Sequence, residues 1–275
     1  MEIEALPSAV QKLAGLGDAW KEPKWLDYLS LGLEFTHIPI LIGIVEDRAQ
    51  LWNESAGSSD TMWMPVHAWR ALAQLKAATA VPTLLELLHE IDDEGNEIIQ
   101  EDLPDVLAQI GPGALEQTGM YLCSKSNPLW ARISAAYALR NLASANQELC
   151  PAVITLLEHV LEAYLSNDRT LNGFLVAFLA DLQAAACSPL IEQAYLANRV
   201  DESILGDFED FQVAVGLLER RLTPRRRKPR LPVPPRPITT EMTDLAHSAH
   251  PLIKTSKGKR KHERFVSQHK SKKKR

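Results

Sequence analysis

Four six-residue segments of the chain share one pattern of apolar and polar positions. In each segment a large apolar residue is followed three positions later by another. The segments cover residues 70–75, 105–110, 137–142 and 177–182. Their first large apolar residues, Leu72, Leu107, Leu139 and Leu179, are spaced 35, 32 and 40 residues apart. Because a spacing of three puts both side chains on one helix face, each segment predicts a helix with a buried stripe.

A second apolar segment follows each of these helices and begins at or near a proline. The prolines are Pro82, Pro112, Pro151 and Pro189. Proline suits the first turn of a helix, where its missing N–H would have no partner in any case. The repeated unit is therefore a helix, a short turn and a second helix. One such pair cannot bury its apolar face alone, so neighbouring pairs are expected to stack.

The two ends of this repeated region are less regular. A degenerate first unit is expected over residues 25–42, with Thr36 as the N-cap of its helix. A polar segment, residues 53–60, separates it from the second unit. A closing helix is expected over residues 207–218, with Phe208, Phe211, Val215 and Leu218 as its apolar stripe.

The Ala-Leu-x-x-Leu helix, the tight turn and the proline-initiated second helix resemble HEAT-like repeats, in particular the short type first noticed in phycobilisome lyases. The resemblance covers roughly residues 25–200 and implies an all-α fold, an α-solenoid of the HEAT-like/ARM-like superhelix type. The phrases at residues 65–72 and 200–207 also resemble a family of uncharacterised bacterial HEAT-repeat proteins. That family implies no catalytic residues, and a repeat fold of this kind serves many unrelated tasks.

The charge of the chain is divided between its two ends. Residues 1–219 hold 11 Lys+Arg and 32 Asp+Glu, a net charge of −21, whereas residues 220–275 hold 19 and 3, a net charge of +16. Together with the repeat, this division predicts three parts: a solenoid over residues 1–222, a Pro/Arg-rich linker over residues 223–240, and a disordered Lys/Arg-rich tail over residues 241–275.

The cations of the linker and tail are candidates for binding a polyanion. Dense positive charge attracts phosphates and gives a salt-sensitive affinity that does not depend on nucleotide sequence. The residues are Arg225, Arg226, Arg227, Lys228, Lys257, Lys259, Arg260, Lys261, Lys272, Lys273 and Lys274. Three interpretations stay open: contact with RNA, the ribosome or DNA; docking onto the acidic body or an acidic protein partner; and a solubilising tail without a partner.

The densest acidic region lies between residues 86 and 105. Its candidate acidic face consists of Glu90, Asp92, Asp93, Glu94 and Glu97. We expect a solvated face, with protein docking as an alternative; the spacing does not match a calcium-binding loop, so no metal is predicted. Glu101 and Asp102, just before Pro104, are expected to lie near a helix N-terminus.

Aromatic residues gather at the start of the second unit. Trp52, Trp63, His67 and Trp69 form a candidate partner-binding patch, because large apolar side chains outside a helix stripe mark interfaces when they are exposed. The alternative is burial against the first unit.

No catalytic motif, cofactor-binding motif or CxxC pair occurs in the sequence. The three cysteines, Cys123, Cys150 and Cys187, are expected to be buried free thiols. The acidic N-terminus and the lack of a long apolar run argue against a secretory signal and a membrane span, so a cytoplasmic protein is expected. The function that this predicts is a non-catalytic protein-binding scaffold or adaptor with a polyanion-binding tail and no cofactor. The alternative is a phycobilin-lyase-like chromophore-binding protein, which rests on the repeat type.

Overall fold

The computed structural model describes residues 2–21, 24–48, 60–93 and 95–224. Within these ranges all regular structure is helical and no strand occurs, which confirms the expected all-α class. The chain divides into two units, residues 1–219 and residues 220–275, and the helices named below all belong to the first. In the described part of the chain, no helix combines the length and apolar character needed to cross a membrane.

The four predicted helix pairs are present, whereas the degenerate first unit has 3-10 turns followed by a single α-helix, Ile38–Glu46. The first helices of the pairs are α4 (Met64–Gln74), α7 (Glu97–Ile110), α9 (Leu129–Ala145) and α11 (Arg169–Asp181). The second helices are α5 (Val81–Leu87), α8 (Leu115–Cys123), α10 (Cys150–Glu162) and α12 (Ser188–Leu196). Further helices are α1 (Ser8–Gln11), α2 (Ile38–Glu46), α6 (His89–Asp93) and α13 (Phe208–Ala214). Short 3-10 turns lie at Ile3–Ala5, Lys12–Gly15, Leu29–Leu31, Phe35–His37, Thr61–Trp63, Ala78–Ala80, Pro112–Ala114, Gln147–Leu149 and Ala185–Cys187.

The apolar stripe of the repeat is buried as predicted. Leu72, Leu107, Leu139 and Leu179 are each at most 1% exposed. Three of the four prolines stand in the first turn of α5, α10 and α12, and the fourth opens the 3-10 turn that leads into α8. The sequence pattern therefore identified buried positions of the first helices and the start of the second helices. The burial of α4 and α11 goes beyond one stripe, because every residue from 64 to 73 and from 171 to 180 is buried.

Two of the turns between paired helices have the same geometry. After α4, Lys76 has a φ of 54°, and the N–H of Ala77 donates to the carbonyl of Leu72 at 3.0 Å. After α11, Gln183 has a φ of 58°, and the N–H of Ala184 donates to the carbonyl of Leu179 at 3.0 Å. These are Schellman motifs, in which one left-handed residue closes the helix.

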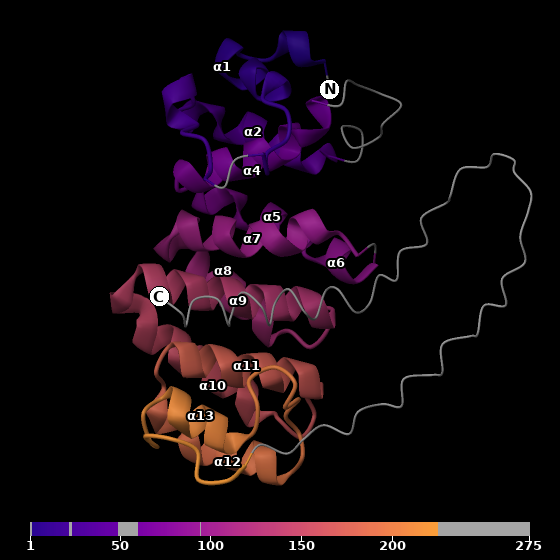
Figure 1. The fold of residues 1–275 in the computed structure, drawn as a ribbon. Helices are drawn as coiled ribbons and strands as arrows, with labels where there is room; N and C mark the ends of the chain where they lie inside the picture. Colours follow the sequence, from indigo (N-terminus) through magenta and orange to yellow (C-terminus); the bar gives the residue numbers. More distant parts are fainter. Residues whose placement is uncertain (1, 22–23, 49–59, 94, 225–275) are drawn as a thin grey trace, which may run out of the picture. The chain divides into compact units, whose positions relative to one another are not determined.

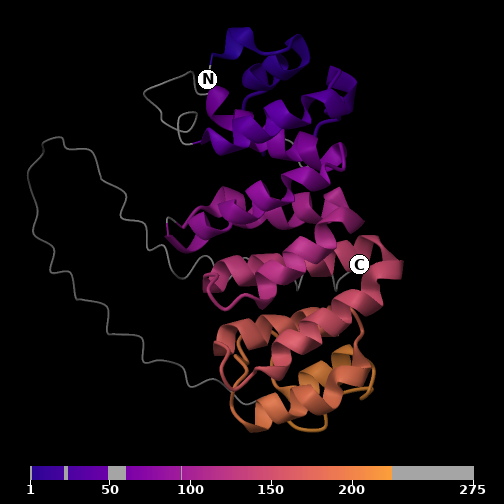
Figure 2. The ribbon, with the colours of Figure 1, turned by 180° about the vertical axis from the view of Figure 1, so that it is seen from behind.

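The helices of the first unit follow one another in space in chain order (Figure 1). The first helices contact one another in sequence, α4 with α7, α7 with α9, and α9 with α11, and α2 contacts α4. The second helices do the same, α5 with α8 and α8 with α10, on the other side of the stack (Figure 2). Because α7 contacts α5, α9 contacts α8 and α10, and α11 contacts α10, the core from α5 to α11 lies between two layers of helices.

Three local expectations differ from the structure. Thr36 is not an N-cap: Glu34 and His37 form the cap of the preceding 3-10 turn, and the Thr36 hydroxyl donates to Glu34 at 2.7 Å. Pro104 lies inside α7 and not near its start, because Asn96 caps this helix by accepting from the N–H of Ile99. The closing helix is α13, which is shorter than expected and is capped by Asp207.

Candidate functional site

A buried ion pair joins the first two helix pairs. The guanidinium of Arg70 in α4 donates to both carboxylate oxygens of Asp102 in α7, at 2.6 to 3.1 Å. The indole N–H of Trp69 donates to the same carboxylate at 2.5 Å. Arg70 is 3% exposed and Asp102 is 5% exposed. Burial acts to lower the pKa of Arg70, but the contacts with Asp102 outweigh it and raise this pKa, so the guanidinium stays protonated.

The same cluster of Trp69, Arg70 and Asp102, called the clamp below, also holds the N-terminal segment. A second N–H of Arg70 donates to the carbonyl of Ala19 at 2.6 Å, and its guanidinium lies 5.1 Å from the ring centroid of Trp25. Beside it, the amide of Gln74 donates to the carbonyl of Leu26 at 2.7 Å and accepts from the N–H of Tyr28 at 2.8 Å. Polar side chains of α4 therefore hold the N-terminal segment in place through hydrogen bonds to residues about fifty positions earlier in the sequence.

His67 links the same two regions as a neutral imidazole. Its Nε2 lies 2.9 Å from the carbonyl of Gly17, which can only accept, so Nε2 carries the proton. Its Nδ1 then accepts from the hydroxyl of Tyr28 at 2.8 Å. Burial lowers the pKa of His67 and raises the pKa of Tyr28 to about 12. Both groups are therefore uncharged at neutral pH.

The predicted partner-binding patch is largely internal. His67 and Trp69 are 1% and 0% exposed, so these two side chains present no surface to a partner, and burial is the correct alternative for them. Trp63 is half-buried, with its ring centroid 6.0 Å from that of Trp20. Trp52 lies outside the described residues.

The predicted acidic face is partly engaged in structural contacts. Glu90 is half-buried and forms an ion pair with Arg48, whose Nε donates to it at 2.6 Å. Asp92 accepts from the N–H groups of Trp130 and Ala131, at 3.0 and 2.9 Å. It therefore caps the N-terminus of α9 although it lies 38 residues before Trp130 in the sequence. The expectation of a solvated face is therefore wrong for these two acids.

Among the other predicted acidic residues and the cations of the linker and tail, only Glu97 has a described side chain. Glu97 is exposed in the first turn of α7, whereas the side chain of Asp93 and all of Glu94 lie outside the described part of the structure. The linker and tail cations, from Arg225 to Lys274, also lie outside it. In the described ranges, no group of three His, Cys, Asp or Glu side chains is arranged to hold a metal ion.

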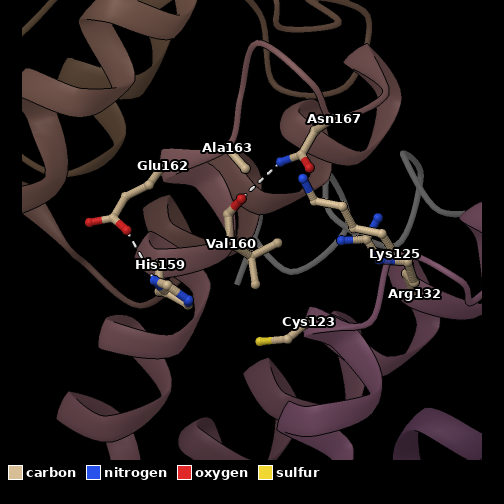
Figure 3. Close-up of a pocket in the computed structure, with 8 residues that line it drawn as sticks. All are labelled: Cys123, Lys125, Arg132, His159, Val160, Glu162, Ala163 and Asn167. Carbon is tan, nitrogen blue, oxygen red and sulfur yellow. Dashed lines mark hydrogen bonds and ion pairs between the residues drawn. The ribbon is translucent and has the colours of Figure 1, made fainter.

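A pocket of about 310 Å³ lies where α8 ends, α9 begins and α10 ends (Figure 3). It is lined by Cys123, Lys125, Arg132, His159, Val160, Glu162, Ala163 and Asn167. No pattern in the sequence predicts this site, because its residues come from three separate helices and the connections that follow two of them. The available signal was Arg132, a cation within the apolar run that opens α9 after Pro128.

The cysteines differ in environment. All three are free, but only Cys187 is buried; Cys123 and Cys150 are half-buried, which corrects the expectation of three buried thiols. Burial and the nearby carboxyl group of Glu158 raise the pKa of Cys187 to about 12. Burial also raises the pKa of Cys123, against the opposing charge of Arg132. Both thiols are thus protonated at neutral pH.

The fold and these contacts define an all-helical protein assembled from consecutive helix pairs. The chain belongs to the family described as "Protein of unknown function (DUF1186)", whose model matches residues 33–226. Neither the curated proteins nor the solved structures contain a match. The family match confirms kinship with a group that has no assigned function and identifies no site residues.

Proposed function

We propose that the helical unit is a HEAT-like α-solenoid that acts as a non-catalytic scaffold for a protein partner, while the basic second unit binds a polyanion. The solenoid assignment is supported by the packing of successive first helices from α4 to α11, by the contacts of α8 with α5 and α10, and by the matching turns after α4 and α11. Repeats of this type present long surfaces built from many helices, which suits a scaffold.

The observation that carries the proposal is where the charge divides. The helical unit, residues 1–219, has a net charge of −21, and the second unit, residues 220–275, has +16. The boundary between the structural units is therefore also the boundary between the two signs of charge. A polyanion is attracted to the second unit and repelled by the first, so one end of the chain can hold it while the helices stay available.

The test measures binding of single-stranded RNA to the full chain at several salt concentrations. Each cation that pairs with a phosphate contributes about −0.7 to the slope of log K against log salt concentration on single strands. Replacing Lys272, Lys273 and Lys274 by Gln is expected to make the slope about 2 units shallower. The matched control replaces Lys12, Lys21 and Lys24, which are exposed on the helical unit, and is expected to leave the slope unchanged.

Two results would count against this function. Absence of RNA binding at low salt removes the nucleic-acid half of the proposal. Tighter binding of a peptide of residues 220–275 to the full chain than to RNA indicates that the tail docks on the acidic helical unit and not on a polyanion. The chromophore-binding alternative rests on the repeat type alone, and a shifted absorbance of an added linear tetrapyrrole would support it.

A further inference from the structure

Arg132 is a buried cation with no acidic partner among the described residues. Among the other arginines of the helical unit, Arg48, Arg70 and Arg140 pair with carboxylates. Arg169 is exposed and Arg199 is half-buried, and both donate to carbonyl or amide oxygens. Arg132 is 8% exposed, and in the described structure it makes one hydrogen bond, from Nε to the carbonyl of Leu122 at 2.9 Å.

The unused N–H groups of Arg132 open into the pocket. An arginine carries five N–H donors, and among the residues that the structure describes only one of the donors of Arg132 has a partner. None of its nitrogens is among the fully buried polar atoms without a partner, so the others are accessible from the pocket that Arg132 lines. A guanidinium in this state presents a planar fork of donors that matches a carboxylate or a phosphate.

A second cation lines the same pocket. The ammonium of Lys125 donates to the hydroxyl of Ser166 at 3.1 Å, which holds it beside the connection between α10 and α11 (Figure 3). The one carboxylate on the wall, Glu162, pairs with His159 at 3.0 Å. Both cations therefore remain available to a ligand.

The rest of the wall is apolar or already satisfied. Val160, Ala163 and the protonated thiol of Cys123 carry no charge. The amide nitrogen of Asn167 is committed to the carbonyl of Val160 at 2.8 Å and to Asn172 at 3.0 Å. A volume of about 310 Å³ is at the lower end of the range of about 300–1,000 Å³ that small-molecule pockets occupy.

We propose that this pocket binds a small organic oxyanion, with Arg132 and Lys125 holding the carboxylate or phosphate group and Val160 and Ala163 contacting its apolar part. The ligand supplies the negative charge that the buried guanidinium lacks. The site is independent of polyanion binding by the tail, because it lies within the helical unit and involves none of the cations of the tail.

Cys123 provides a reporter inside the pocket. The experiment alkylates the full-length protein with iodoacetate, which carries a carboxylate, and with iodoacetamide, which is neutral, and follows each cysteine by mass spectrometry. The ratio of the two rates at one thiol cancels its own pKa and accessibility. Attraction by the two cations is expected to make this ratio about fivefold higher at Cys123 than at Cys150, which follows the acidic Glu148 in sequence.

Variants and competing anions complete the test. Arg132→Met and Lys125→Met are each expected to bring the ratio at Cys123 close to that at Cys150, whereas Lys76→Met, outside the pocket, leaves it unchanged. Lys125 is exposed, so its variant remains informative if Arg132→Met fails to fold.

Inorganic phosphate and acetate, compared at equal ionic strength, are expected to slow iodoacetamide at Cys123. Stronger protection by one of them identifies the group that the site prefers. Equal ratios at the two cysteines of the wild-type protein, no change in Lys125→Met, or no protection by either anion would each overturn the proposal.

Discussion

The clamp between α4 and α7 makes a strong prediction for the variant Asp102→Asn. The carboxylate of Asp102 accepts from Arg70 and from the indole of Trp69, and all three residues are buried. Asparagine has almost the same shape but no charge, and its NH₂ group would face one of these donors. The substitution therefore leaves the Arg70 cation buried without a counter-charge and changes little else.

The magnitude follows from the burial of the pair. Breaking a buried ion pair by removing one partner costs about 3–5 kcal/mol. In a domain of about 150–250 residues, 1 kcal/mol corresponds to about 2–4 °C in melting temperature. Asp102→Asn is therefore expected to lower the melting temperature by roughly 6–20 °C.

The assay is thermal unfolding followed by circular dichroism at 222 nm, with urea unfolding to obtain the free energy. Glu97→Gln removes a carboxylate from the same helix at an exposed position and is expected to change stability by less than about 0.5 kcal/mol. The double variant Arg70→Met with Asp102→Leu removes both charges, and it is expected to be more stable than Asp102→Asn. A melting temperature for Asp102→Asn within 2 °C of the wild type would refute the reasoning.

Two further predictions concern stability. His67 has a lowered pKa in the folded state, so below its unfolded pKa of about 6.5 only the unfolded chain takes up the proton, and the free energy of unfolding falls by up to about 1.4 kcal/mol per pH unit. Urea titrations between pH 8 and pH 5 should therefore show a shallower decline in His67→Gln, and parallel curves would contradict this. In Gly173→Ala the new Cβ would lie 2.6 Å from Ile204 and 2.9 Å from the carbonyl of Asp201, which is expected to cost about 1–3 kcal/mol of unfolding free energy. The control Gly43→Ala meets no atom within 4 Å and is expected to be neutral or to stabilise its helix by up to about 1 kcal/mol, so equal losses in both variants would argue against the packing explanation.

The parts of the fold that depend on local rules could be predicted from the sequence. The spacing of Leu72 and Leu107 with their partners three residues later defines a helix face, and the structure buries both leucines. Pro82 and Pro151 mark helix starts because proline lacks an N–H, and both stand in a first turn. Periodicity and proline chemistry act over a few residues, which is why a single sequence reveals them.

The polar contacts could not be predicted in the same way. Arg70 and Asp102 are 32 residues apart in sequence, and Asp92 caps a helix that begins nearly forty residues later. No local rule states which acid meets which donor after stacking. A signal was nevertheless present, since Arg70 and Arg132 are cations placed within apolar helical runs. Such a residue needs a counter-charge or an opening to solvent. Arg70 pairs with Asp102, and Arg132 lines a pocket.

The contacts of the N-terminal segment bear on where this protein can be cut. The family match begins at residue 33, yet the carbonyls of Gly17 and Ala19 and the hydroxyl of Tyr28 already satisfy His67 and Arg70. A fragment trimmed to the matched region would leave the buried N–H donors of His67 and Arg70 without their partners and would expose that end of the helical unit to solvent. The folding unit is thus longer than the region of shared ancestry, and expression or crystallisation work is best begun well upstream of it.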